Sequence, residues 1–425
     1  MTTPVYLSAE QQADLNNFRT VVKRQLRPMS GIDPRLVADY VLQHAPLMRA
    51  AALARELLDY LMTARELLSS GDSHYRKLTL EMAATMDILS DLQDETEARY
   101  RQALTLYAQY EPASADFALA YAAYGDYLLR HNQEPAGAAA YNKALDLATN
   151  HPEAAAKIAA GMGRALMEKG QFEKAISFFE RAVAALRQLD AAQTLAEVYA
   201  EYALALIQVG RLGQAGEFLE KAFETSQTLG LIALRAKVLR QRAYLNQTRA
   251  EATEQDTAKH DYQRQAEDAL HEAIAILVTL PETNELAVAY HDLGRYQAQQ
   301  KQLDEAESHV RMSCELFSRT GNRRNFAVSQ ITLAQILMLK NGNILGAVER
   351  VRQALKIAAE IGDSFTQRQA AESLVRIHRI QAKRSSDMPD ETQQQIMYSR
   401  HIFEVLRLGE YVNQLDMVLQ TLGTA

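Results

Sequence analysis

Few residues in this chain have the types and spacing that catalysis or cofactor binding requires. The segment GMGRAL at 161–166 begins like a glycine-rich dinucleotide loop, but it lacks the third glycine and no strand precedes it. HEAIA at 271–275 begins like a zinc-protease motif, but Ala275 stands where the second histidine would be. The one cysteine, Cys314, can form no internal disulfide. We therefore predict that the chain is not an enzyme and has no cofactor and no metal site.

The composition favours an all-helical protein. Of 425 residues, 48% are apolar and 23% are charged, with only 18 Gly and 9 Pro, so the chain can bury a core and has few turn formers. A net charge of −7 argues against a general nucleic-acid binder. The sequence has no apolar run of about 18 residues and no signal-peptide pattern at its start. We expect a cytoplasmic protein with no nucleic-acid or membrane partner.

Small residues recur at fixed offsets, and they define the elements that must position any site. In GRALMEKGQFEKAISFFERAVAAL, at 163–186, the marked residues are Gly163, Gly170, Ala175, Phe179 and Ala182. Forty residues further on, the same offsets hold Ala203, Gly210, Ala215, Leu219 and Ala222. We interpret each unit as a pair of helices that approach closely at the small residues. Gly170 marks the turn, where glycine tolerates a positive φ.

This pattern resembles the tetratricopeptide repeat family over about residues 76–361, with a spacing of 38–41 residues instead of the usual ~34. The resemblance implies an all-α fold, a right-handed superhelical solenoid of antiparallel helix pairs. We expect residues 1–75 to be an N-terminal helical segment or a degenerate first repeat. Residues 76–361 would form the repeat array. Residues 362–425 would form a degenerate last helix pair and a C-terminal capping helix.

Three irregular segments interrupt or flank the repeats. Pro46 indicates a corner between two N-terminal helices. The polar insert at 246–263 extends both helices of its unit or forms a loop. In the tail, one helical face holds Val412, Leu415, Val418 and Leu419, which favours a cap over the end of the array.

The resemblance also implies that the first helix of each pair lines a concave surface. Carried onto this sequence, the surface residues are Lys157, Arg164, Lys237, Arg240, Tyr244, Gln247, His291, Arg295 and Gln299. Arginine forms forked, charge-assisted bonds to carboxylates, and glutamine pairs with peptide backbone. The alternative is that these bases are solvated or pair with Glu and Asp on adjacent helices.

We therefore predict a non-catalytic scaffold that binds a protein or an extended peptide, with acidic side chains or a free C-terminal carboxylate. The alternative is a bacterial peptide-sensing or signalling regulator, in which residues 1–75 form an N-terminal helical effector module. The sequence leaves the oligomeric state open.

Overall fold

The protein is all-α. The computed structural model describes residues 9–25, 32–50, 53–89, 92–131, 133–189, 191–280, 284–361, 363–384 and 389–423. These residues contain 20 helices and no strand. The helices are α1 (Ala9–Gln25), α2 (Pro34–Ala50), α3 (Ala54–Glu66), α4 (Ser73–Met86), α5 (Gln93–Tyr110), α6 (Ala115–Arg130), α7 (Glu134–Leu147), α8 (Pro152–Glu168), α9 (Phe172–Leu186), α10 (Ala192–Gln208), α11 (Leu212–Thr228), α12 (Ile232–Ala252), α13 (Asp256–Leu277), α14 (Asn284–Gln299), α15 (Leu303–Arg319), α16 (Arg323–Asn341), α17 (Ile344–Glu360), α18 (Ser364–Arg384), α19 (Pro389–Val405) and α20 (Gly409–Gly423).

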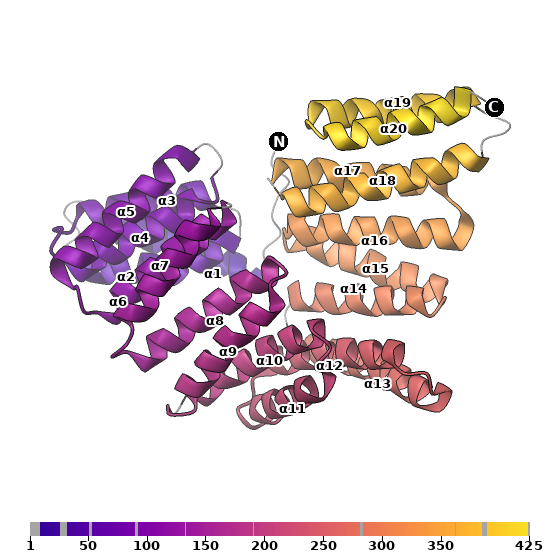
Figure 1. The fold of residues 1–425 in the computed structure, drawn as a ribbon. Helices are drawn as coiled ribbons and strands as arrows, with labels where there is room; N and C mark the ends of the chain where they lie inside the picture. The colour runs from indigo at the N-terminus through magenta and orange to yellow at the C-terminus, as the bar shows by residue number, and fades with distance from the viewer. Residues whose placement is uncertain are drawn as a thin grey trace. The chain divides into compact units, whose positions relative to one another are not determined.

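The chain divides into two compact units, Leu7–Ala269 and Leu270–Ala425, with the boundary inside α13. In the first unit, α6 packs on α7, α8 on α9 and α10 on α11 (Figure 1). In the second, α14 packs on α15 and α16 on α17 (Figure 1). Short turns join the two helices of each pair, which gives the helical solenoid expected from the sequence. The division at 75 and 361 stays a prediction.

The predicted close approach of paired helices at small residues is confirmed. Phe179 is fully buried between Ala175 and Ala182, and a Cβ at Gly163 would lie 2.8 Å from its ring. At Gly294, an added Cβ would lie 2.5 Å from Val310 Cγ2. Each glycine therefore lets one helix of a pair approach the other closely.

The Gly294→Ala variant is expected to lower the free energy of unfolding of the unit Leu270–Ala425 by about 2 kcal/mol. The added methyl group would also lie 3.0 Å from the backbone oxygen of Ala306, which cannot rotate away. This clash outweighs the ~1 kcal/mol by which alanine favours a helix over glycine. Urea unfolding followed by circular dichroism measures the loss. Gly213→Ala is the control, because its methyl group meets nothing within 4 Å, and a similar loss there would contradict the explanation.

The predicted turn glycines adopt left-handed backbone conformations. Gly170 has a φ of +70° and Gly210 a φ of +77°. In the pair α14–α15, the corresponding turn holds Lys301, with a φ of +64°. Lys301, a residue with a Cβ, therefore adopts the left-handed backbone conformation that glycine adopts in the other two turns.

For this reason, Lys301→Gly is expected to stabilise the unit Leu270–Ala425 by about 1 kcal/mol, the usual left-handed penalty of a residue with a Cβ. Lys301 is exposed, so the substitution removes little packing. Thermal unfolding should move upward by a few degrees. Lys301→Ala keeps the Cβ and serves as the control. An equal gain in that variant would assign the effect to the lysine side chain instead of the backbone.

Two segments that the sequence marked as irregular are largely helical in the structure. Pro46 lies inside α2, which corrects its interpretation as a corner. Its neighbours Ala45 and Met48 are fully buried, so packing offsets the hydrogen bond that proline removes. In the insert at 246–263, only residues 253–255 are non-helical, which confirms that both helices are extended.

Candidate binding surface

Within each unit, first helices of successive pairs contact one another. In Leu7–Ala269, α6 contacts α8, α8 contacts α10, and α10 contacts α12. In Leu270–Ala425, the same relation joins α14, α16 and α18, and the last described helix, α20, continues this layer by contacting α18. We call the exposed side of each of these two layers the first-helix surface of its unit. All nine residues predicted to bind a ligand lie on first helices, namely α8, α12 and α14.

Two of the predicted bases share one carboxylate. Arg164 Nη1, on α8, donates to Glu201 Oε2 of α10 at 2.9 Å. Lys237 Nζ, on α12, lies 3.6 Å from Glu201 Oε1. Glu201 is thus held between bases from both neighbouring first helices. Lys157 is separate from this group and pairs with Glu153 of its own helix at 2.7 Å.

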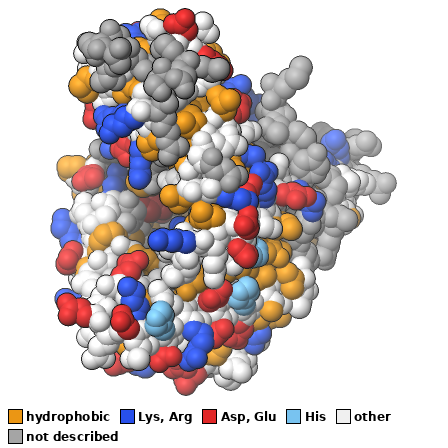
Figure 2. Space-filling view, turned by 90° about the vertical axis from the view of Figure 1, so that its right-hand side faces the viewer, with side chains coloured by type: hydrophobic (Ala, Val, Ile, Leu, Met, Phe, Trp, Pro, Cys, Tyr) orange, Lys and Arg blue, Asp and Glu red, His pale blue; other side chains and the backbone are white. Residues whose placement is uncertain are grey.

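The other predicted residues of this unit also have partners or are buried. Tyr244 Oη accepts a hydrogen bond from Gln208 Nε2 at 3.1 Å. Arg240 also interacts with a neighbouring group. Gln247 is 7% exposed and offers a ligand little surface. On the face of the molecule that Figure 2 draws, basic and acidic side chains are interspersed.

His291, Arg295 and Gln299 belong to the unit Leu270–Ala425. His291 Nδ1 lies 3.0 Å from the Oγ of Ser329, a buried residue of α16. Arg295 is half-buried and Gln299 is exposed. The nine predicted residues therefore divide between two first-helix surfaces, and Arg164 and Lys237 meet around one carboxylate, that of Glu201.

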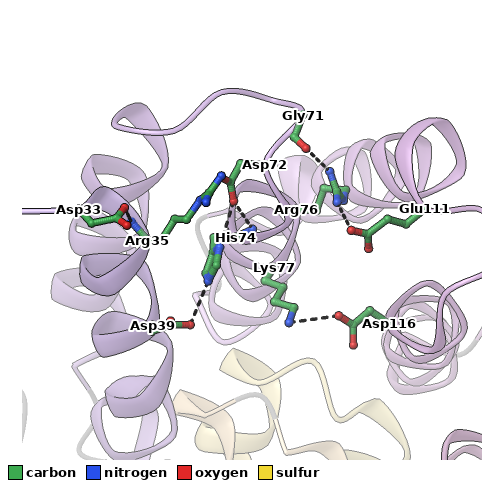
Figure 3. Close-up of polar contacts among 10 residues, drawn as sticks. All are labelled: Asp33, Arg35, Asp39, Gly71, Asp72, His74, Arg76, Lys77, Glu111 and Asp116. Atoms are coloured by element: carbon green, nitrogen blue, oxygen red, sulfur yellow. Dashed lines mark hydrogen bonds and ion pairs between the residues drawn. The ribbon is translucent and has the colours of Figure 1, made fainter.

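A second polar cluster joins the N-terminal ends of α2, α4 and α6 (Figure 3). Arg35 Nε donates to Asp72 Oδ2 at 2.7 Å. Burial of Asp72 opposes ionisation, but hydrogen bonds from Arg35 and His74 prevail and lower its pKa to about 2. Lys77 Nζ lies 3.2 Å from Asp116 at the start of α6. These contacts tie successive first helices together.

Sequence reasoning missed a polar cavity of about 540 Å³ in the unit Leu270–Ala425. Its walls come from α18 and from the turn into α20. The lining residues are Arg368, Glu372, Arg407, Leu408, Gly409, Glu410 and Tyr411. The repeat pattern is weak here, so the sequence signalled only a degenerate pair. The available signal was the recurrence of Arg368, Glu372 and Arg376 at four-residue intervals.

Membrane-spanning helices and metal sites are both absent from the described part of the chain. No helix there is both long and apolar enough to cross a membrane. In the same residues, no group of three or more His, Cys, Asp or Glu side chains is arranged to hold a metal ion.

These helix pairs and their first-helix layers define a helical-repeat solenoid protein. Residues 156–185 and 196–228 match the family model of the tetratricopeptide repeat, and the two segments begin 40 residues apart. Residues 156–228 therefore carry tetratricopeptide repeats of the long-spaced type that the sequence predicted.

Solved structures of similar fold include the human IFIT1 dimer with PPP-AAAA, at 14% identity and a TM-score of 0.54, covering 96% of this chain and 94% of that one. A monomeric IFIT1 mutant with Gppp-AAAA has 14% identity and a TM-score of 0.53, covering 98% and 95%. A Rap protein complexed with competence and sporulation factor has 15% identity and a TM-score of 0.50, covering 83% and 98%. At these identities the likeness shows the fold alone. No curated protein matches the chain.

Proposed function

We propose that the protein is a non-catalytic scaffold that binds another polypeptide through its first-helix surfaces. The observation that supports this most is the contact between successive first helices, which lays exposed side chains of several repeats side by side. Such a layer offers many contact points to an extended chain, and repeat arrays commonly bind partners in this way.

The ion pairs of the first unit restrict what that partner can be. Arg164 and Lys237 already contact Glu201, so a partner carboxylate has to compete with Glu201 for both bases. Exposed pairs of this kind are worth about 1 kcal/mol or less each, which makes such exchange feasible. An acidic peptide, or one with a free C-terminal carboxylate, would therefore exchange ion pairs at this position.

Site-specific photo-crosslinking tests the scaffold function. A photoreactive benzoylphenylalanine is placed at Glu197, which is exposed on the first helix α10, in the full chain expressed in its source cells. The matched control carries it at Glu217, which is exposed on the second helix α11. We expect polypeptide adducts, identified by mass spectrometry, from position 197 and far fewer from 217. Adducts from 217 alone would place binding on the second helices and contradict the proposal.

The alternative of a signalling regulator concerns the same surfaces but adds an effector function for residues 1–75. The printed description of the Rap structure names a bound competence and sporulation factor, and that binding belongs to Rap. For this chain, the regulator requires a partner that contacts α1–α3 separately from the repeat surface. Adducts obtained from exposed Asp59 of α3 would support it.

A further inference from the structure

The first helix α18 and the last described helix, α20, carry a surface unlike that around Glu201. Along α18, five exposed side chains recur every three or four residues and so share one helical face: Phe365, Arg368, Glu372, Arg376 and Arg379. The opposite face is buried, with Leu374 and His378 fully enclosed. The stripe is therefore the solvent side of a well-packed helix.

The facing part of α20 completes this surface. Tyr411 Oη donates to Glu372 Oε1 at 3.2 Å, and Arg379 Nη2 donates to Gln414 Oε1 at 3.1 Å. Between these helices lies the 540 Å³ cavity, which Arg368 and Arg407 both line. We call the α18 stripe with Arg407, Glu410, Gln414 and Met417 the α18–α20 surface.

The charges on this surface are not balanced. It holds four arginines and two glutamates, a net charge of about +2, in a chain whose net charge is −7. Within the described residues, no ion pair joins Arg368, Arg376 or Arg407 to an acidic side chain. By contrast, Arg323 and Arg324 of the same unit pair with Glu360 and Asp363. Uncompensated arginines attract carboxylates, because guanidinium and carboxylate groups form forked hydrogen bonds.

The backbone at Arg407 adds a second, independent observation. Its φ is +57°, in the left-handed region that glycine occupies in the turns at 170 and 210. An ordinary residue costs about 1–2 kcal/mol there. The chain nevertheless has an arginine at this position, and its side chain lines the cavity.

Exposed apolar side chains accompany the arginines. Phe365, near the start of α18, is 63% exposed, and Met417 of α20 is 55% exposed. From Phe365 to Arg379 the helix rises about 21 Å, which an extended strand covers in about six residues. The surface therefore matches a short segment that carries carboxylates and an apolar side chain.

We propose that the α18–α20 surface binds an acidic polypeptide segment of about six residues, with carboxylates on Arg368, Arg376 and Arg407 and an apolar side chain against Phe365. This inference rests on the proposed scaffold function and places an acidic partner segment on this surface in addition to the surface around Glu201, where a partner carboxylate has to compete with Glu201.

Fluorescence anisotropy on the full chain tests the assignment. The probe is a fluorescein-labelled hexapeptide with four consecutive Asp and Glu residues between two leucines, with both ends capped. A second probe replaces the acids by Asn and Gln, which keeps shape and removes charge. We expect the acidic probe to bind at least tenfold more tightly, with an affinity that falls as salt is raised. Equal binding of the two probes would overturn the proposal.

Substitutions locate the binding. Arg368→Gln with Arg407→Gln should weaken binding of the acidic probe by tenfold or more. Arg311→Gln with Lys356→Gln makes the same charge change on the second helices α15 and α17 and should leave binding within about twofold. These side chains are exposed or half-exposed, and circular dichroism melts check that each variant folds. An equal effect of the two double variants would overturn the assignment.

Two other outcomes separate this inference from the scaffold function. In the first outcome, the double variant Arg164→Ala with Lys237→Ala loses probe binding, and Arg368→Gln with Arg407→Gln retains it. This result would overturn the assignment to the α18–α20 surface but would not contradict the scaffold function. In the second outcome, sedimentation shows that the chain self-associates, that Arg368→Gln with Arg407→Gln makes it monomeric, and that the acidic probe does not compete with self-association. The occupant of the surface is then a second copy of the chain, and the proposal is wrong. The crosslinking test at position 197 judges the scaffold function by itself.

Discussion

Replacing Arg76 with alanine is expected to lower the free energy of unfolding of the unit Leu7–Ala269 by about 4 kcal/mol. Arg76 lies on α4, and its side chain is only 2% exposed. Its guanidinium forms an ion pair with Glu111 and donates to the backbone oxygen of Gly71 at 3.1 Å (Figure 3). It also lies 5.4 Å from the ring centre of Tyr110.

The size of this effect follows from burial. Alanine removes the charge that Glu111 faces, frees the carbonyl of Gly71 and leaves a cavity beside the rings of Tyr107 and Tyr110. Arg76→Met should lose less, about 1–2 kcal/mol, because methionine fills much of the volume and Glu111, at 31% exposure, remains within reach of water. The difference in free energy of unfolding between Arg76→Ala and Arg76→Met therefore separates the contribution of side-chain packing from that of the ion pair.

Chemical unfolding of both variants, followed by circular dichroism, measures the losses. Lys77→Ala is the matched control in the next position of α4, because its pair with Asp116 is largely exposed on both sides. We expect that control to change the free energy of unfolding by less than about 1 kcal/mol. Similar losses for Arg76→Ala and Lys77→Ala would show that the Arg76 contacts do not stabilise the unit as argued.

Acidification from about pH 6.5 to about pH 4 is expected to remove about 3 kcal/mol of stability from the unit Leu270–Ala425 through His378 alone. This residue of α18 is fully buried, and burial lowers its pKa to about 4. In the unfolded chain a histidine has a pKa of about 6.5. The difference of about 2.5 pKa units corresponds to ~3 kcal/mol.

The partners of His378 explain why the neutral ring is favoured. Nδ1 lies 2.9 Å from Gln381 Oε1, an acceptor, so Nδ1 carries the hydrogen of the neutral ring, and Nε2 lies 2.8 Å from Ser399 Oγ. Ser399 Oγ also accepts from Arg352 Nη2 at 2.8 Å. A proton on Nε2 would face an oxygen that already receives a donor, beside the positive charge of Arg352.

The sign of the pH dependence follows directly. Above pH 6.5 the ring is neutral in both states and the folded network is intact. As the pH falls from 6.5 toward 4, the unfolded chain gains the proton first, so stability is lost. Urea unfolding at several pH values, compared with the variant His378→Gln, isolates this contribution from other titrating groups. Parallel stability curves for the two proteins would contradict it.

The sequence predicted the repeat architecture well because steric rules act locally. A small residue such as Gly163 against Phe179 is needed wherever two helices approach closely, and Gly170 suits a left-handed turn. Such constraints repeat with the helix pair and can be read from spacing. The same rules failed at Lys301, where the backbone takes the conformation without a glycine, and at Pro46, where burial of its neighbours keeps α2 helical.

The sequence by itself determined that this chain is an all-α array of paired helices, and that basic residues such as Arg164 and Lys237 lie on first helices. Only the tertiary structure decided that these two bases meet at Glu201, while Arg368 and Arg407 line a cavity without an acidic partner in the described residues. Helix periodicity fixes the face on which a side chain lies. Ion pairing depends on which side chains of other helices, often about 37 residues away in the chain, come within hydrogen-bonding distance.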